Sequence, residues 1–93
     1  MASLSFSLTN GKYVATVEEL TASANVDVER EQKGVITVYQ RAHGATAWKV
    51  PTDVELAKYQ SDVCFNLLVE AGSMDFQIVS QTEVTAAILN QVS

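Results

Sequence analysis

The stretch GVITVYQRAHGATAWKVP, residues 34–51, decides the fold. Residues 35–39 are all β-branched or aromatic, the side chains that fit a pleated, half-buried sheet surface, so we expect a strand in the centre of a sheet. A polar break at residues 40–44 separates it from a second extended segment, which stops at Pro51 because proline cannot donate to a sheet ladder. The stretch therefore predicts a hairpin. It also carries the only histidine, His43, and the only tryptophan, Trp48. We expect the Trp48 side chain to fill the core.

Residues 3–17 have the pattern of a second β-hairpin. Apolar residues at positions 4, 6 and 8 alternate with serines, which gives a strand one apolar face. Asn10-Gly11 follows, and this pair is typical of a two-residue turn that needs positive φ at both positions. The expected register pairs Thr9 with Lys12, Leu8 with Tyr13, Phe6 with Ala15 and Leu4 with Val17.

Alternation of apolar and polar residues predicts further strands along the chain. Residues 26–29 alternate, and the charged turn that follows them predicts a hairpin with the central run at residues 35–39. Residues 18–25 predict no more than a loop or a short helix. Residues 74–78 alternate strictly, and residues 84–89 are expected to close the sheet.

Residues 53–71 have two readings. The sequence Thr52-Asp-Val-Glu55 is a capping box, and the apolar spacing that follows fits a helix over residues 53–71. The alternative is a linker followed by a strand over residues 62–70, with Phe65 and Leu67 on the core face. We favour the strand because it leads through Gly72-Ser73 directly into the strand at residues 74–78. The helix would make the fold α+β.

The favoured fold is a single all-β domain over residues 1–93, a small antiparallel β-sandwich of about seven strands. Short strands with turn signals every 8 to 12 residues predict two packed sheets. An apolar content of 47% with 18% charged residues is that of a globular protein. The net charge of −5 argues against nucleic acid as a partner, because a phosphate backbone requires a concentrated basic surface.

The sequence also bears on cellular location and chemistry. The N-terminus lacks a basic leader, and no apolar run approaches the roughly 20 residues of a membrane helix, so we expect neither a secretory signal nor a membrane span. Cys64 is the only cysteine and is expected near the core. No catalytic, phosphate-binding or calcium-binding motif occurs, so we expect no enzyme, cofactor or metal site. His43, close to Arg41, could serve as a general base or metal ligand, but an exposed loop histidine is the favoured interpretation. Cys64 lacks the electropositive setting and the neighbouring base that a nucleophile needs.

The order of several elements resembles small β-sandwich modules of tailed-phage virions, the capsid-decoration and head-fibre proteins. The resemblance covers residues 34–89 and rests on the strand from Gly34, a turn with Gly44, Trp48, the segment Asp62-Val-Cys-Phe-Asn66 and the strand Met74-Asp-Phe-Gln-Ile78. Such modules often place arginine in the penultimate strand, where this chain has Asp75 and Gln77. The resemblance implies self-association, often as trimers, and attachment to a larger protein shell in the virion or host cytoplasm.

We therefore expect a non-enzymatic structural protein that acts through protein–protein contacts. The alternative is a carbohydrate-binding or adhesion module that uses Trp48, Tyr39 and Tyr59 as an aromatic platform. Apolar residues on strand faces opposite the core are candidates for contact with a partner, as is the turn at residues 40–46. The candidate interaction residues are Gln40, Arg41, His43, Trp48, Val14, Cys64, Leu68 and Val79.

Overall fold

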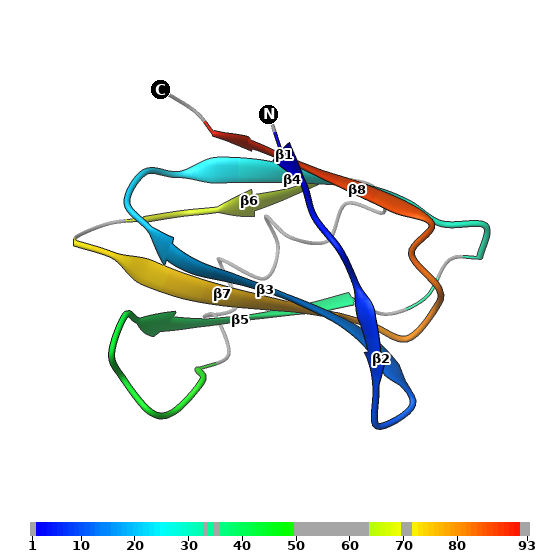
Figure 1. The fold of residues 1–93 in the computed structure, drawn as a ribbon, viewed down its shortest axis with the longest axis horizontal. Coiled ribbons are helices and arrows are strands. Elements are labelled where there is room, and N and C mark those ends of the chain that lie inside the picture. Colours follow the sequence, from blue (N-terminus) through cyan, green and yellow to red (C-terminus); the bar gives the residue numbers. More distant parts are fainter. Residues whose placement is uncertain (1, 33, 35, 50–63, 70–71, 92–93) are drawn as a thin grey trace.

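The computed structural model describes residues 2–32, 34, 36–49, 64–69 and 72–91. These residues contain eight strands. They form two antiparallel sheets that face each other, and no helix occurs among these residues (Figure 1). The all-β sandwich prediction is confirmed. The strands are β1 (Ala2–Ser3), β2 (Ser7–Thr9), β3 (Lys12–Leu20), β4 (Ala24–Glu29), β5 (Ile36–Ala42), β6 (Cys64–Leu67), β7 (Met74–Ser80) and β8 (Ala86–Gln91).

Each sheet has four strands. Sheet I has the order β1-β8-β4-β6, and sheet II has the order β2-β3-β7-β5. In Figure 1 sheet I lies above sheet II, and the chain passes between the two layers several times. Successive side chains of a strand point to opposite faces, so each sheet has one face toward the core and one outer face.

The core lies between the two sheets and receives apolar side chains from both. Phe65 and Leu67 come from β6 of sheet I, while Phe76 and Ile78 come from β7 of sheet II. All four are at most 1% exposed. The strands therefore hold together mainly by burial of the apolar faces that their alternating sequences create.

The hairpin around Asn10-Gly11 forms as predicted at its turn. Thr9 pairs with Lys12 and Leu8 with Tyr13, and both turn residues have positive φ, 51° for Asn10 and 77° for Gly11. The expected pairing of Phe6 with Ala15 and of Leu4 with Val17 is wrong.

Instead, the chain crosses from sheet I to sheet II between β1 and β2. The backbone N–H of Leu4 donates to the carbonyl of Ala87 at 2.9 Å, and β1 pairs with β8. Leu4 and Phe6 both pack against the core during this crossing. Their burial is thus obtained between the sheets, without a longer hairpin.

The predicted hairpin between residues 26–29 and 35–39 is also wrong. β4 belongs to sheet I and β5 to sheet II, so the charged segment between them links the two layers. Thr82 fixes this segment: its hydroxyl donates to the carbonyl of Gln32 at 2.9 Å and accepts from Arg30 at 3.1 Å. β5 lies at the edge of sheet II and not in its centre, and only a bridge between Gln40 and Lys49 continues beyond it among the described residues.

The helix alternative for residues 53–71 is wrong where the structure describes this segment. Cys64–Leu67 is a strand that pairs with β4, and its burial alternates as the strand interpretation predicts. Residues 50–63 lie outside the described residues. The loop or short helix expected at residues 18–25 is replaced by the end of β3 at Leu20 and the start of β4 at Ala24.

Candidate functional site

Asp75 is a carboxylate on the outer face of sheet II that is nevertheless only 1% exposed. On β7 its neighbours Met74 and Phe76 turn toward the core, so strand alternation points Asp75 the other way. Removing a carboxylate from water is costly unless hydrogen bonds and opposite charges compensate. The groups that cover and bind Asp75 therefore define the candidate site.

The first partner comes from a β-bulge in β3. Val17 pairs with Phe76 and Leu20 pairs with Met74, so two residues, Glu18 and Glu19, lie opposite the single residue Asp75. Glu19 has a φ of 55°, and its backbone N–H donates to Oδ1 of Asp75 at 2.9 Å. A bulge redirects the backbone locally, and here it aims an N–H group at the buried carboxylate.

Arg41 and His43 supply the side-chain partners. Arg41 lies directly opposite Asp75 on β5, and its Nε donates to Oδ2 of Asp75 at 2.9 Å. His43 follows β5, and its Nδ1 lies 2.9 Å from Oδ1 of Asp75. A turn closed by the hydrogen bond from Ala45 N–H to the carbonyl of Ala42 holds the imidazole there, with Gly44 at a φ of 93° that favours glycine.

His43 stands between two carboxylates. Its Nε2 lies 2.9 Å from Oε1 of Glu19, while its Nδ1 contacts Asp75. Both nitrogens can donate at once only in the imidazolium form. Accordingly, the hydrogen bond to Asp75 raises the pKa of His43 above its ordinary 6.5, and the charges of Asp75, Glu19 and Glu18 act in the same direction.

The pKa of Asp75 shifts the opposite way, from 3.8 to about 2. The backbone N–H of Glu19 is the main cause, and the hydrogen bonds from Arg41 and His43 add to it, while burial opposes the shift. The ionised form of Asp75 is thus the one that this environment stabilises.

Trp48 completes the arrangement, which we call the Asp75 cluster (Asp75, Glu19, Arg41, His43 and Trp48). Two backbone hydrogen bonds of 2.9 and 2.8 Å pair Gln40 with Lys49, and continuing this antiparallel register places Trp48 opposite Arg41. The guanidinium carbon of Arg41 lies 4.1 Å from the ring centroid, a cation–π contact. Trp48 is half-buried on the outer face, so its expected place in the core is wrong.

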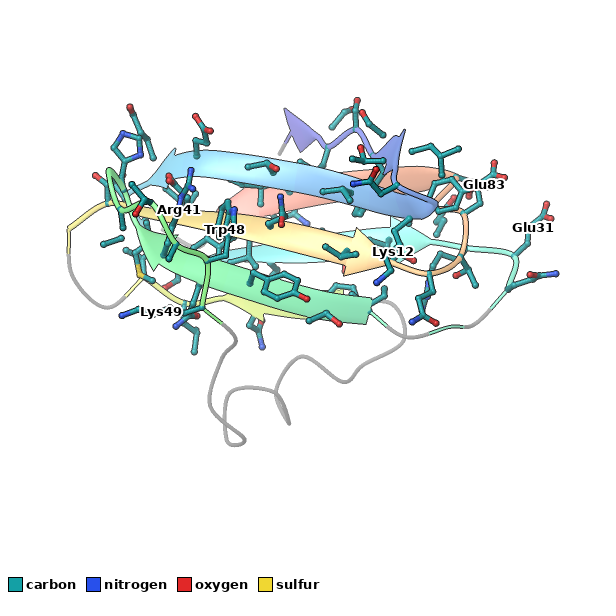
Figure 2. All side chains as sticks on the ribbon, turned by 90° about the horizontal axis from the view of Figure 1, so that it is seen from below. Lys12, Glu31, Arg41, Trp48, Lys49 and Glu83 are labelled. Atoms are coloured by element: carbon teal, nitrogen blue, oxygen red, sulfur yellow. The ribbon has the colours of Figure 1, made fainter. Side chains whose placement is uncertain are left out.

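Several predicted interaction residues share the outer face of sheet II with this cluster. Val14 and Val79 are direct cross-strand neighbours there, and Tyr39 pairs with Gln77 one row closer to Arg41. Both valines and Tyr39 are half-buried. Figure 2 shows Arg41, Trp48 and Lys49 gathered at one end of the molecule, with Glu31 and Glu83 at the other.

The structure separates the remaining candidates from this face. Gln40 pairs with Phe76 and lies two residues after the buried Val38, so strand alternation places it on the core-facing side of β5. Cys64 belongs to β6 of sheet I, where it pairs with Asp27, and Leu68 directly follows the end of that strand. Burial, with a contribution from Asp27, raises the pKa of the Cys64 thiol, which disfavours the reactive thiolate.

Sequence reasoning missed Asp75 and Glu19 as members of the site. One signal for Asp75 was present, since it is a carboxylate inside a strictly alternating strand. Nothing in the sequence located the bulge that brings Glu19 to it, because a bulge depends on pairing between strands distant in the chain.

Surface hollows also occur away from the Asp75 cluster, one of them about 230 Å³ in volume and bordered by residues 4–6 and 84–87. A hollow of about 250 Å³ is bordered by Glu31, Gln32, Glu83 and Thr85, far from the Asp75 cluster (Figure 2). The described residues contain no group of three or more metal-ligating side chains in a suitable arrangement. Within the same residues no helix reaches the length and hydropathy needed to cross a membrane.

No protein-family model, curated protein or solved structure matches this chain.

Proposed function

We propose that this protein is a non-enzymatic structural protein that acts through protein–protein contacts, associating with copies of itself and with a larger shell such as a phage virion. One observation carries the proposal: the outer face of sheet II combines a row of half-buried apolar residues with an arginine stacked on a tryptophan. Tryptophan, tyrosine and arginine are the residues most enriched among energetically dominant interface positions.

The composition of the face supports a protein partner. Val14 and Val79 offer apolar area that is only partly covered, and Tyr39 and Trp48 lie on the same face. Their arrangement matches interfaces in which an apolar centre is bordered by polar groups. The resemblance of residues 34–89 to phage virion modules suggests the kind of assembly and stays a prediction.

Sedimentation velocity over a wide concentration range tests self-association. We expect the wild type to form oligomers and Val79→Lys to shift it toward monomer, because a lysine on this face would have to be desolvated in the contact. Ile88→Lys is the matched control, since Ile88 is an exposed aliphatic residue on sheet I. A wild type that remains monomeric throughout, or an equal effect of both variants, would contradict the proposal.

Carbohydrate binding is the second candidate, favoured by the position of Trp48 and Tyr39 outside the core. Arg41 already covers one face of the Trp48 ring, which leaves less of the ring for stacking against a sugar. Tyr59, the third residue of the predicted platform, lies outside the described residues. A glycan array with the wild type and Trp48→Ala tests this function, and it requires binding by the wild type that the folded variant loses.

A further inference from the structure

We propose that the terminal edge of the Arg41 guanidinium, supported by Trp48, is a carboxylate-binding site that receives an acidic side chain of the protein partner. This inference rests on the proposed function and names the chemistry of the partner at that contact. It follows from how Arg41 is held, from which of its donors are used and from the charges around it.

Arg41 is held in one orientation by two contacts. Its Nε is fixed by the 2.9 Å hydrogen bond to Oδ2 of Asp75, a residue that is itself only 1% exposed. The ring of Trp48 lies against the guanidinium plane at 4.1 Å. A side chain that is already ordered loses little conformational entropy on binding, so this arginine is prepared for a ligand.

The same contacts leave the outer part of the guanidinium unused. Arginine has five N–H donors, and the hydrogen bond to Asp75 uses only the one on Nε. Within the described residues, Nη1 and Nη2 with their four donors have no hydrogen-bond partner. The Arg41 side chain is 21% exposed, so part of it remains accessible to solvent. Two parallel N–H groups at fixed spacing match the two oxygens of a carboxylate.

The surrounding charges favour a carboxylate over a more highly charged anion. Lys49, which is exposed, adds a positive charge next to Trp48, and Figure 2 shows it at the same end of the molecule as Arg41. His43 is engaged by Glu19 and Asp75. Glu18 and Glu19 on the neighbouring bulge repel anions, and they repel a phosphate dianion more than a carboxylate with a single charge. Trp48 also offers an apolar surface for the methylene groups of a glutamate.

The test is an NMR titration of the isotopically labelled full chain with the blocked tripeptide acetyl-Gly-Glu-Gly-amide. We expect saturable shifts of the Arg41 Nε–H and the Trp48 indole N–H, with no such shifts from the acetyl-Gly-Gln-Gly-amide control. Arg41→Lys should weaken binding about tenfold, because lysine keeps the charge but loses the planar fork. Lys49→Gln, at an exposed position, should weaken it about twofold.

Three outcomes would overturn the inference: equal shifts with the glutamine peptide, tighter binding of inorganic phosphate, or unchanged affinity in Arg41→Lys. If Arg41→Lys does not fold, Trp48→Leu and Lys49→Gln decide, since both leave the Arg41–Asp75 pair in place and both must weaken binding. The outcome is separable from that of the proposed function. A monomeric wild type contradicts self-association but leaves the peptide titration readable, whereas oligomers that are unaffected by Arg41→Lys contradict this inference alone.

Discussion

Asp75 accepts hydrogen bonds from a bulge N–H, an arginine and a histidine in a position closed to water. Asp75→Asn keeps the size of the side chain but removes the charge that pairs with Arg41 and His43. The variant therefore leaves a largely covered guanidinium without its counter-charge, which is costlier than losing a neutral hydrogen bond. We expect a melting temperature lower by several degrees, measured by circular dichroism.

Glu83→Gln is the matched control for Asp75→Asn, because it removes a carboxylate from an exposed position. An isolated surface substitution of this kind has little effect on stability. Equal melting temperatures for the two variants would show that the contacts of Asp75 do not contribute to stability.

The titration of His43 makes a prediction about pH. Its pKa is raised in the folded state, so its stabilising contribution is complete below its ordinary 6.5 and is lost as the pH rises through the folded value. The pKa of Asp75 is lowered to about 2, so its contribution is present above 3.8 and is lost as the pH falls toward that value. Together they stabilise the fold most between 3.8 and 6.5.

Urea unfolding of the wild type and of His43→Gln tests this dependence. Glutamine cannot carry the proton that links Glu19 and Asp75, so the wild type should be the more stable protein at about pH 5.5. The difference in the free energy of unfolding should shrink at about pH 8.5. A difference that is constant over this range, or one that grows with pH, would exclude the charged histidine as the stabilising form.

At the scale of the element, the β2–β3 hairpin depends on its turn. Gly11 has a φ of 77°, and a Cβ at this position would meet no atom within 4 Å. Gly11→Ala thus introduces backbone strain without a steric clash, and we expect a loss of about 1 kcal/mol in the free energy of unfolding. Gly11→Asn should cost less, because asparagine tolerates this conformation. Urea denaturation measures both, and an equal loss would show that the turn does not require positive φ.

This hairpin also illustrates which parts of the fold can be predicted from sequence. Its turn and the register of Ser7–Thr9 against β3 follow from local signals within a few residues of each other. The crossing at Leu4 and Phe6 does not follow from local signals. Both residues pack against the core that the two sheets share, and alternation alone does not show which sheet their backbone joins. The predicted pairing of residues 26–29 with residues 35–39 is wrong for the same reason, because local alternation does not show that β4 and β5 belong to different sheets.

The candidate site shows a similar division. The sequence predicts Arg41 and His43 as contact candidates because they lie in the turn at residues 40–46, and Trp48 because an exposed aromatic ring could form part of a binding platform. Their common partner Asp75 lies 34 positions from Arg41 along the chain and 56 from Glu19, and only the pairing of β7 with β5 and β3 brings them together. Pairing between distant strands therefore brings Asp75 and Glu19 to the site, while local sequence indicates only the residues at and near the turn after β5.

At the scale of the whole molecule, the two sheets are joined by a single shared core. Phe76 of sheet II is completely buried in it together with Phe65 and Leu67 of sheet I. Phe76→Ala should lower the free energy of unfolding by about 3–5 kcal/mol, because a cavity remains where the ring was. A domain of this size has roughly 5–15 kcal/mol in total, so much of the stability should be lost.

Urea denaturation monitored separately by far-ultraviolet circular dichroism and by Trp48 fluorescence measures this effect. Ile78→Val, which removes one methylene from the same core, should cost about 0.5–1.5 kcal/mol and provides a reading if Phe76→Ala does not fold. Leu8→Ala is the control, since Leu8 is 66% exposed and should change stability by no more than about 0.5 kcal/mol. Because both sheets depend on one core, the two signals should change together in every variant. Separate transitions would mean that sheet I and sheet II unfold independently, and they would contradict a single cooperative core.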